Sequence, residues 1–100
     1  MALHIISKSP FKHDAFVSAM RALSENDAVL LIEDGVYAAQ NIAELSSAII
    51  AAPTAVEFYA LAADLQARGI QGLVNPAIAQ VDDFDFVKLT ENHTPCISWF

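Results

Sequence analysis

Short runs of apolar residues alternate along this chain with longer windows in which apolar residues recur at helical spacing. Continuous apolar runs of four or five residues are typical of strands buried on both faces of a parallel sheet. The runs lie at residues 3–6, 28–32, 57–61, 78–81 and 96–99. The pattern predicts a three-layer α/β domain, with a mostly parallel sheet of about five strands and helices on both faces.

The window after the first strand predicts an amphipathic helix. Asp14 stands where an N-cap side chain is expected. The apolar residues that follow are spaced at i, i+3, i+4 and i+7, which places them on one stripe of a helix. They are Phe16, Ala19, Met20 and Leu23. This stripe is expected to pack on the sheet.

Three further helices are predicted at residues 38–50, 62–68 and 83–89. The helix at 62–68 is followed by Gly69, which suits the left-handed residue after a helix, and Ile70 is placed for the hydrophobic contact that often follows. The last helix is preceded by Asp82 and Asp83, either of which is a suitable cap. No linker or repeat interrupts the order, so residues 1–100 are expected to form a single domain.

The amino-acid composition indicates that this chain binds another protein. Hydrophobic residues make up 55% of the chain and charged residues only 17%, whereas an ordinary domain has about 25% charged residues. Part of the surface is therefore expected to be covered by another protein. The net charge of −7 has the wrong sign for direct binding to nucleic acid. No apolar stretch has the length of a membrane span or a signal peptide, so we expect a cytoplasmic protein.

Candidate chemistry is sparse. Glycine-rich phosphate-binding motifs are absent, and no cofactor is predicted. Asp34, Asp82 and Asp83 follow predicted strands, where clustered carboxylates would suit a magnesium ion in a regulatory or metal-binding module. Carboxylates at such positions are more often helix caps or turn residues, and we prefer that interpretation. A metal site is therefore an alternative and not the main prediction.

Cys96 is the only cysteine, so it forms no internal disulfide. A lone cysteine can act as a nucleophile or sulfur carrier if it is exposed and its surroundings favour the thiolate. Its place in the predicted last strand favours a buried, inert thiol instead. The histidines at positions 4, 13 and 93 have neither metal-ligand spacing nor a catalytic partner close in sequence.

Four sequence blocks together resemble a known family of proteins. The run LHIISKSP at residues 3–10 is followed at residues 30–39 by LLIEDGVYAA. Further along, FYAL at residues 58–61 and DLQARG at residues 64–69 agree as well. These blocks resemble the TusB/DsrH family of sulfur-relay proteins. The resemblance extends to the strand that ends near Trp99, so it covers nearly the whole chain.

The resemblance implies a flavodoxin-like, DsrEFH-like fold and a place in a heterohexamer with sister TusC/TusD-like or DsrE/DsrF-like subunits. Such complexes take persulfide sulfur from an upstream carrier and pass it to a downstream one. In the Tus branch the sulfur ends in 2-thiouridine at the tRNA wobble position, and the transferring cysteine belongs to the D-type subunit. In the Dsr branch, H-type subunits usually carry a cysteine in the first helix. That helix has none here, which favours tRNA thiolation over sulfur oxidation.

We therefore predict a non-catalytic structural subunit, with a sulfur carrier that uses Cys96 as the enzymatic alternative. The expected contact residues are Asp34, Gly35, Val36, Tyr37 and Trp99. The first four follow the most apolar strand, and tyrosine and tryptophan suit protein interfaces. Turn geometry and packing explain Gly35 and Tyr37 equally well, and core packing is the alternative for Trp99.

Overall fold

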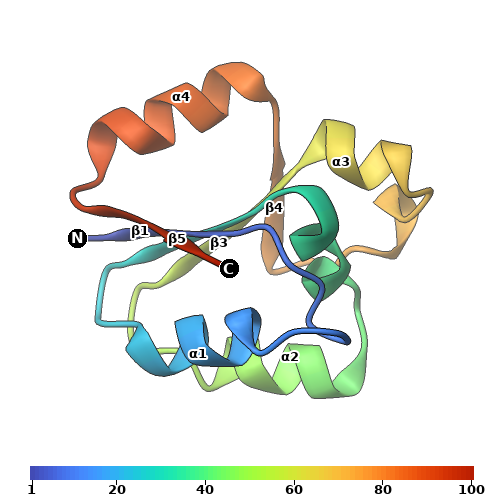
Figure 1. The fold of residues 1–100 in the computed structure, drawn as a ribbon, viewed down its shortest axis with the longest axis horizontal. Helices are drawn as coiled ribbons and strands as arrows, with labels where there is room; N and C mark the ends of the chain where they lie inside the picture. Colours follow the sequence, from blue (N-terminus) through green and yellow to red (C-terminus); the bar gives the residue numbers. More distant parts are fainter.

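The five predicted strands form one parallel sheet in a computed structural model that describes residues 1–100 (Figure 1). Its strands are β1 (Leu3–Ile6), β2 (Ala28–Leu31), β3 (Glu57–Leu61), β4 (Ile78–Val81) and β5 (Cys96–Trp99). Their order is β4-β3-β2-β1-β5, and every neighbouring pair is parallel. The predicted α/β fold with five strands is confirmed, and four of the five strands have the predicted bounds.

The register of the sheet decides which residues lie together at each end of the parallel strands. We call these two ends the amino edge and the carboxyl edge of the sheet. Ile6 at the end of β1 is level with Leu31 on one side and with Trp99 on the other. At the opposite edge, Leu3 is level with Ala28 and Cys96. Trp99 therefore lies at the carboxyl edge, where parallel sheets usually bind ligands, and Cys96 lies at the amino edge.

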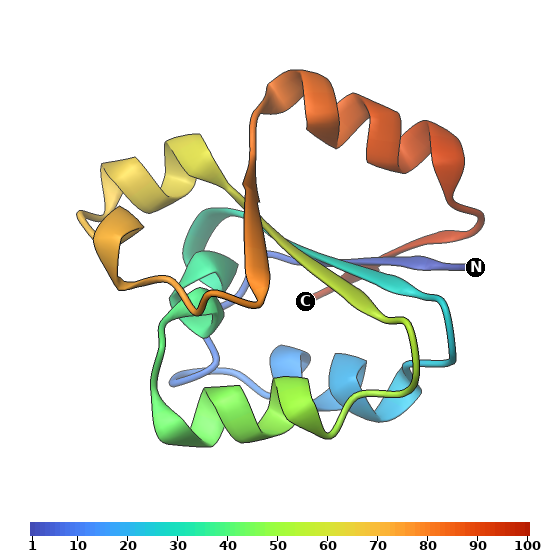
Figure 2. The same cartoon turned by 180° about the vertical axis from the view of Figure 1, so that it is seen from behind.

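Helices cover both faces of the sheet. Figures 1 and 2 show α1 (Ala15–Ala22) and α2 (Ala43–Ile50) side by side on one face and α4 (Asp83–Asn92) across the other. The short helix α3 (Ala62–Ala67) continues directly from β3. Two 3₁₀ helices complete the fold, η1 (Glu33–Ala39) and η2 (Gln71–Leu73). None of the helices combines the length and apolarity needed to cross a bilayer.

The predicted helix at residues 38–50 begins later than expected. The residues after η1 are extended, because Gln40 forms an isolated bridge with Val74 and the amide of Asn41 donates a hydrogen bond of 2.8 Å to the Leu73 carbonyl. This long-range pairing replaces the first turns of the helix, and α2 starts only at Ala43.

Two of the predicted helix boundaries are confirmed in detail. Asp82 accepts a hydrogen bond of 2.8 Å from the Asp85 amide, and the Asp85 side chain accepts one from the Asp82 amide, which forms a capping box. Gly69 has a φ of 67°, and the Ile70 amide reaches back to the Leu65 carbonyl as in a Schellman motif.

The predicted cap at Asp14 is wrong. This residue already has helical dihedral angles, and its side chain makes no capping hydrogen bond. The turn before α1 is closed by Ser9 instead, whose carbonyl accepts the amides of Lys12 and His13.

The two faces of the sheet are covered unequally. The larger core, of 15 buried residues, includes those that α1 and α2 cover, among them Phe16, Val29 and Leu31. The face under α4 holds only four, and α4 itself has no buried residue. Phe86 and Leu89 pack there while half-buried. Residues of β5 that point toward α4 are therefore poorly shielded from water.

Candidate functional site at the carboxyl edge of the sheet

The segment of residues 34–37 forms part of η1, directly beyond β2. The Gly35 backbone lies so close to β1 that an added Cβ atom would stand 2.1 Å from the Ile6 carbonyl oxygen. That oxygen already accepts the Ile32 amide at 3.0 Å, so it is not free to move away. Gly35 is required by this close approach. Val36 is wholly buried in the core and offers no side-chain surface to another molecule.

Helix α3 holds this segment in place from the side. The Asp64 carboxylate accepts a 2.7 Å hydrogen bond from the amide of Glu33, a residue with a left-handed φ of 48°. Arg68 donates from Nε and Nη2 to one oxygen of Asp34 at 3.0 and 2.8 Å. These bonds offset the cost of the left-handed residue, which is on the order of 1 kcal/mol. The pairing of Arg68 with Asp34 was not predicted, because 34 positions separate the two residues.

Tyr37 is half-buried, with the Arg68 guanidinium carbon 6.0 Å from the centre of its ring. It contributes to a cavity of about 300 Å³ that also includes Asp34 and three residues of the loop after β1. Those residues are Ser9, Phe11 and Lys12. The structure therefore brings Asp34 and Tyr37 together at one exposed cavity.

Trp99 also lies at the carboxyl edge of the sheet, but its indole nitrogen points into the protein. Its Nε1 donates a 3.1 Å hydrogen bond to Nδ1 of buried His4, and His4 Nε2 lies 3.0 Å from an oxygen of Asp27. An indole nitrogen can only donate, so His4 Nδ1 must accept, and the neutral ring carries its proton on Nε2. The result is a directed chain of hydrogen bonds from Trp99 through His4 to Asp27.

Asp27 receives more hydrogen bonds than the one from His4. Its carboxylate also accepts the amides of Ala2 at 2.8 Å and Ser24 at 3.0 Å. Burial by itself would raise the pKa of Asp27, but these two amides and the His4 ring outweigh it and hold the pKa below its usual 3.8. The sequence offered no sign of this network, since His4 and Trp99 are 95 positions apart.

Cys96 is exposed, which corrects the prediction of a buried thiol. It begins the edge strand β5 on the thinly covered side under α4. Its Sγ lies 3.8 Å from the Thr90 carbonyl oxygen and 3.7 Å from that of His93. Both neighbours are backbone carbonyl oxygens, which accept hydrogen bonds from the Cys96 thiol.

The three carboxylates of the metal-site alternative are not brought together. Asp34 pairs with Arg68, and Asp82 caps α4, where the amide of Asp85 lowers the pKa of its carboxyl group. No group of three or more histidine, cysteine, aspartate or glutamate side chains is arranged to hold a metal ion. The interpretation of Asp82 as a helix cap is confirmed, and the proposed magnesium cluster at Asp34, Asp82 and Asp83 is wrong.

Comparisons with known proteins agree with this architecture. The chain is similar over 98% of its length to the ychN protein of Escherichia coli, with a TM-score of 0.77 and 14% identity, and the match covers 98% of that chain. It is also similar over 92% of its length to protein Tm0979 of Thermotoga maritima, with a TM-score of 0.67 and 24% identity over 93% of that chain. Both likenesses support the fold.

The sequence comparisons are more specific. Two relatives named Protein TusB, from Escherichia fergusonii and Escherichia coli, are 40% and 39% identical to this chain over 97 residues. Those residues are 97% of this chain and 99% of each relative. The family model described as DsrH like protein matches residues 8–95. Because the family model matches most of the chain and the TusB relatives are about 40% identical over nearly all of it, this chain belongs to the TusB/DsrH family.

Proposed function

We propose that this chain is a non-catalytic structural subunit of a sulfur-transferase complex, which relays persulfide sulfur for 2-thiouridine formation at the tRNA wobble position. Membership of the TusB/DsrH family supports the sulfur relay. The observation that carries the non-catalytic role is the position of Cys96. The only thiol of the chain lies at the amino edge of the sheet, opposite the cavity formed by Asp34 and Tyr37.

A sulfur carrier needs a thiolate as well as access to its donor. Cys96 has the access, because it is exposed on an edge strand. The hydrogen-bond partners of its sulfur are two backbone carbonyl oxygens, those of Thr90 and His93. Thiolates in reactive cysteines are stabilised by nearby cations, helix N-termini or metals. This environment supports a structural role over the carrier alternative.

The partners in this proposal are sister TusC/TusD-like subunits in a cytoplasmic heterohexamer, with upstream and downstream sulfur carriers acting through the complex. The low content of charged residues and the exposed Phe11 and Ile50 support burial against other subunits. The net charge of −7 supports a subunit that does not hold tRNA itself. Asp34, Tyr37 and Trp99 are the proposed contacts at the carboxyl edge.

The tRNA branch is preferred over a Dsr-type role in sulfur oxidation for a reason of sequence. Helix α1, where H-type subunits of the Dsr branch usually carry a cysteine, reads AFVSAMRA and has none. A sulfur-oxidation subunit that used its own thiol would have to use Cys96, at the other edge of the sheet.

The test is a complementation experiment in a strain that lacks this chain but retains the sister subunits. Removing the chain is expected to abolish 2-thiouridine in tRNA, and Cys96→Ser is expected to restore it to the level reached with the unaltered chain. Replacing the transferring cysteine of the D-type sister is the positive control for loss of sulfur transfer. If Cys96→Ser assembles normally but transfers no sulfur, Cys96 is a carrier and the structural role is wrong.

A further inference from the structure

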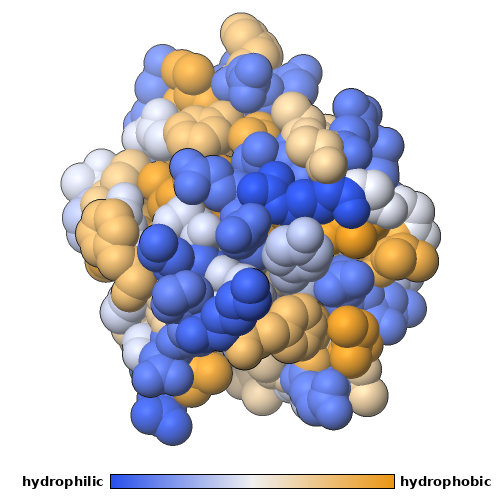
Figure 3. Space-filling model, turned by 45° about the vertical axis from the view of Figure 1, so that its right-hand side comes forward, coloured by the Kyte–Doolittle hydropathy of each residue, from blue (hydrophilic) through white to orange (hydrophobic).

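The shortage of charge in this chain is concentrated on one face. The exposed residues of α1 and α2 include only two charged side chains, Arg21 and Glu44. The others are small or apolar, namely Val17, Ser18, Ala22, Ala43, Ser47 and Ile50. By contrast, four of the seven exposed residues of α4 are charged. Figure 3 shows hydrophobic patches that alternate with hydrophilic ones. The side of the molecule seen in that view therefore has no continuous apolar face.

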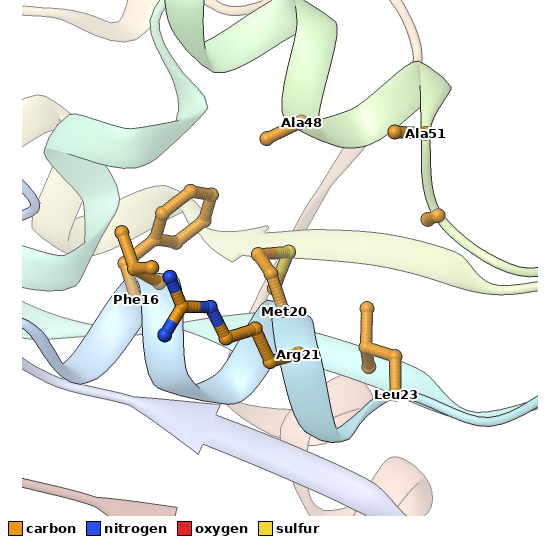
Figure 4. Close-up of a pocket in the computed structure, with 8 residues that line it drawn as sticks. Phe16, Met20, Arg21, Leu23, Ala48 and Ala51 are labelled. Atoms are coloured by element: carbon orange, nitrogen blue, oxygen red, sulfur yellow. The ribbon is translucent and has the colours of Figure 1, made fainter.

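A groove of about 230 Å³ runs between α1 and α2 (Figure 4). Phe16 and Met20 rise from α1, and Ala48 and Ala51 lie across from them. The small alanine side chains leave the groove open and let another element approach the backbone of α2 closely. At its rim, Val17 is 46% exposed, and Ile50 on the same face is 84% exposed.

Arg21 is the only charged residue that lines this groove. It lies in the last turn of α1 and forms no ion pair, although the chain contains 12 acidic residues. An occupant that places a carboxylate beside Arg21 would complement the groove in charge as well as in apolarity. A second copy of this chain fits less well, because each copy brings a net charge of −7.

We propose that the groove between α1 and α2 is the docking site for an amphipathic helix of a sister subunit, with its apolar face on Met20 and Ala48 and a carboxylate on Arg21. A third helix is the occupant that fits a furrow between two neighbouring helices by ridges-into-grooves packing. The inference rests on the proposed function, since it names the surface by which this subunit enters its complex. This surface is separate from the carboxyl-edge contacts at Asp34 and Tyr37.

The test uses two valines of matched exposure on opposite faces. Val17→Glu adds a charge at the groove, and Val87→Glu adds the same charge on α4, where Val87 is 52% exposed. Each variant is co-expressed with the TusC-like and TusD-like chains of the same organism, and assembly is measured by analytical ultracentrifugation of the purified complex. Val17→Glu is expected to weaken assembly at least tenfold, and Val87→Glu less than twofold. Circular dichroism of both variants checks that the helices remain folded.

A second pair of variants tests whether the bound helix places a carboxylate beside Arg21. Arg21→Glu is expected to weaken assembly about tenfold, the change that 1.4 kcal/mol produces, while Arg21→Lys retains most of it. If the unaltered chain does not assemble with the sister chains, the proposed function fails. If it assembles and Val17→Glu behaves like Val87→Glu, the docking site is wrong and the proposed function stands. If Val17→Glu abolishes only self-association, the occupant is a second copy, which also overturns the proposal.

Discussion

Replacing Asp27 by asparagine tests the buried network directly, because the two side chains have the same shape. One carboxylate oxygen of Asp27 accepts the Ala2 amide, and the other accepts Ser24 N and His4 Nε2. An asparagine has one acceptor oxygen and one NH₂ group. Its oxygen can therefore accept either from the Ala2 amide or from Ser24 N and His4 Nε2, but not from both groups of donors. His4 has no way to adapt by moving its proton to Nδ1, because that nitrogen must accept from Trp99.

The best orientation of the introduced asparagine keeps its oxygen on Ser24 and His4 and turns its NH₂ group toward the Ala2 amide. The half-buried Ala2 amide then loses its acceptor, at a cost of about 1–3 kcal/mol. We expect Asp27→Asn to lower the free energy of unfolding by about 2 kcal/mol at pH 7. Asp14→Asn is the matched control, since Asp14 is exposed and caps nothing, and its expected effect is within about 0.5 kcal/mol.

The effect of Asp27→Asn also depends on pH, with a definite sign. The folded-state pKa of Asp27 lies below the usual 3.8, so its stabilisation is fully present above the unfolded pKa and is lost as pH falls through the folded one. The difference between the two proteins should be constant near neutral pH and shrink below pH 3.8. Urea unfolding followed by the fluorescence of Trp99, the only tryptophan, measures it. A difference below about 0.5 kcal/mol at pH 7 would refute the reasoning.

Three further expectations follow from particular residues. Gly35→Ala should destabilise the fold by about 3 kcal/mol in thermal unfolding, because its Cβ would meet the Ile6 backbone, whereas Gly72→Ala, with open space around it, should cost little. Tyr37→Ala should weaken assembly with sister subunits by about 1–3 kcal/mol in analytical ultracentrifugation; unchanged assembly with a large loss of melting temperature would assign Tyr37 to the core. The chain expressed alone should self-associate and be rescued by sister subunits, an expectation that a stable monomer at high concentration would contradict.

The strands of this protein were predictable because short apolar runs bounded by polar and turn-forming residues are typical of strands, although only β2 is buried along its whole length and β5 has no buried residue. Residues 3–6, 57–61, 78–81 and 96–99 form strands where local composition places them. Gly69 was equally predictable, since a left-handed residue after a helix favours glycine for reasons that do not depend on the rest of the fold. The family blocks were also visible without a structure, because they are a property of the order of residues.

The start of α2 and the exposure of Cys96 depended on tertiary structure. Gln40 is extended because Val74 pairs with it, although local spacing favours a helix there. Cys96 is exposed because β5 is an edge strand under a thinly packed helix, and composition does not reveal strand order.

The sequence by itself determined most elements of this protein and its family, because these depend on local patterns of burial and on residue order. Only the tertiary structure decided which side chains meet at the site. Trp99 reaches His4, and Arg68 reaches Asp34, across 95 and 34 positions of the chain. Strand order and register set those distances, and both arise from packing between distant segments, which no local pattern encodes.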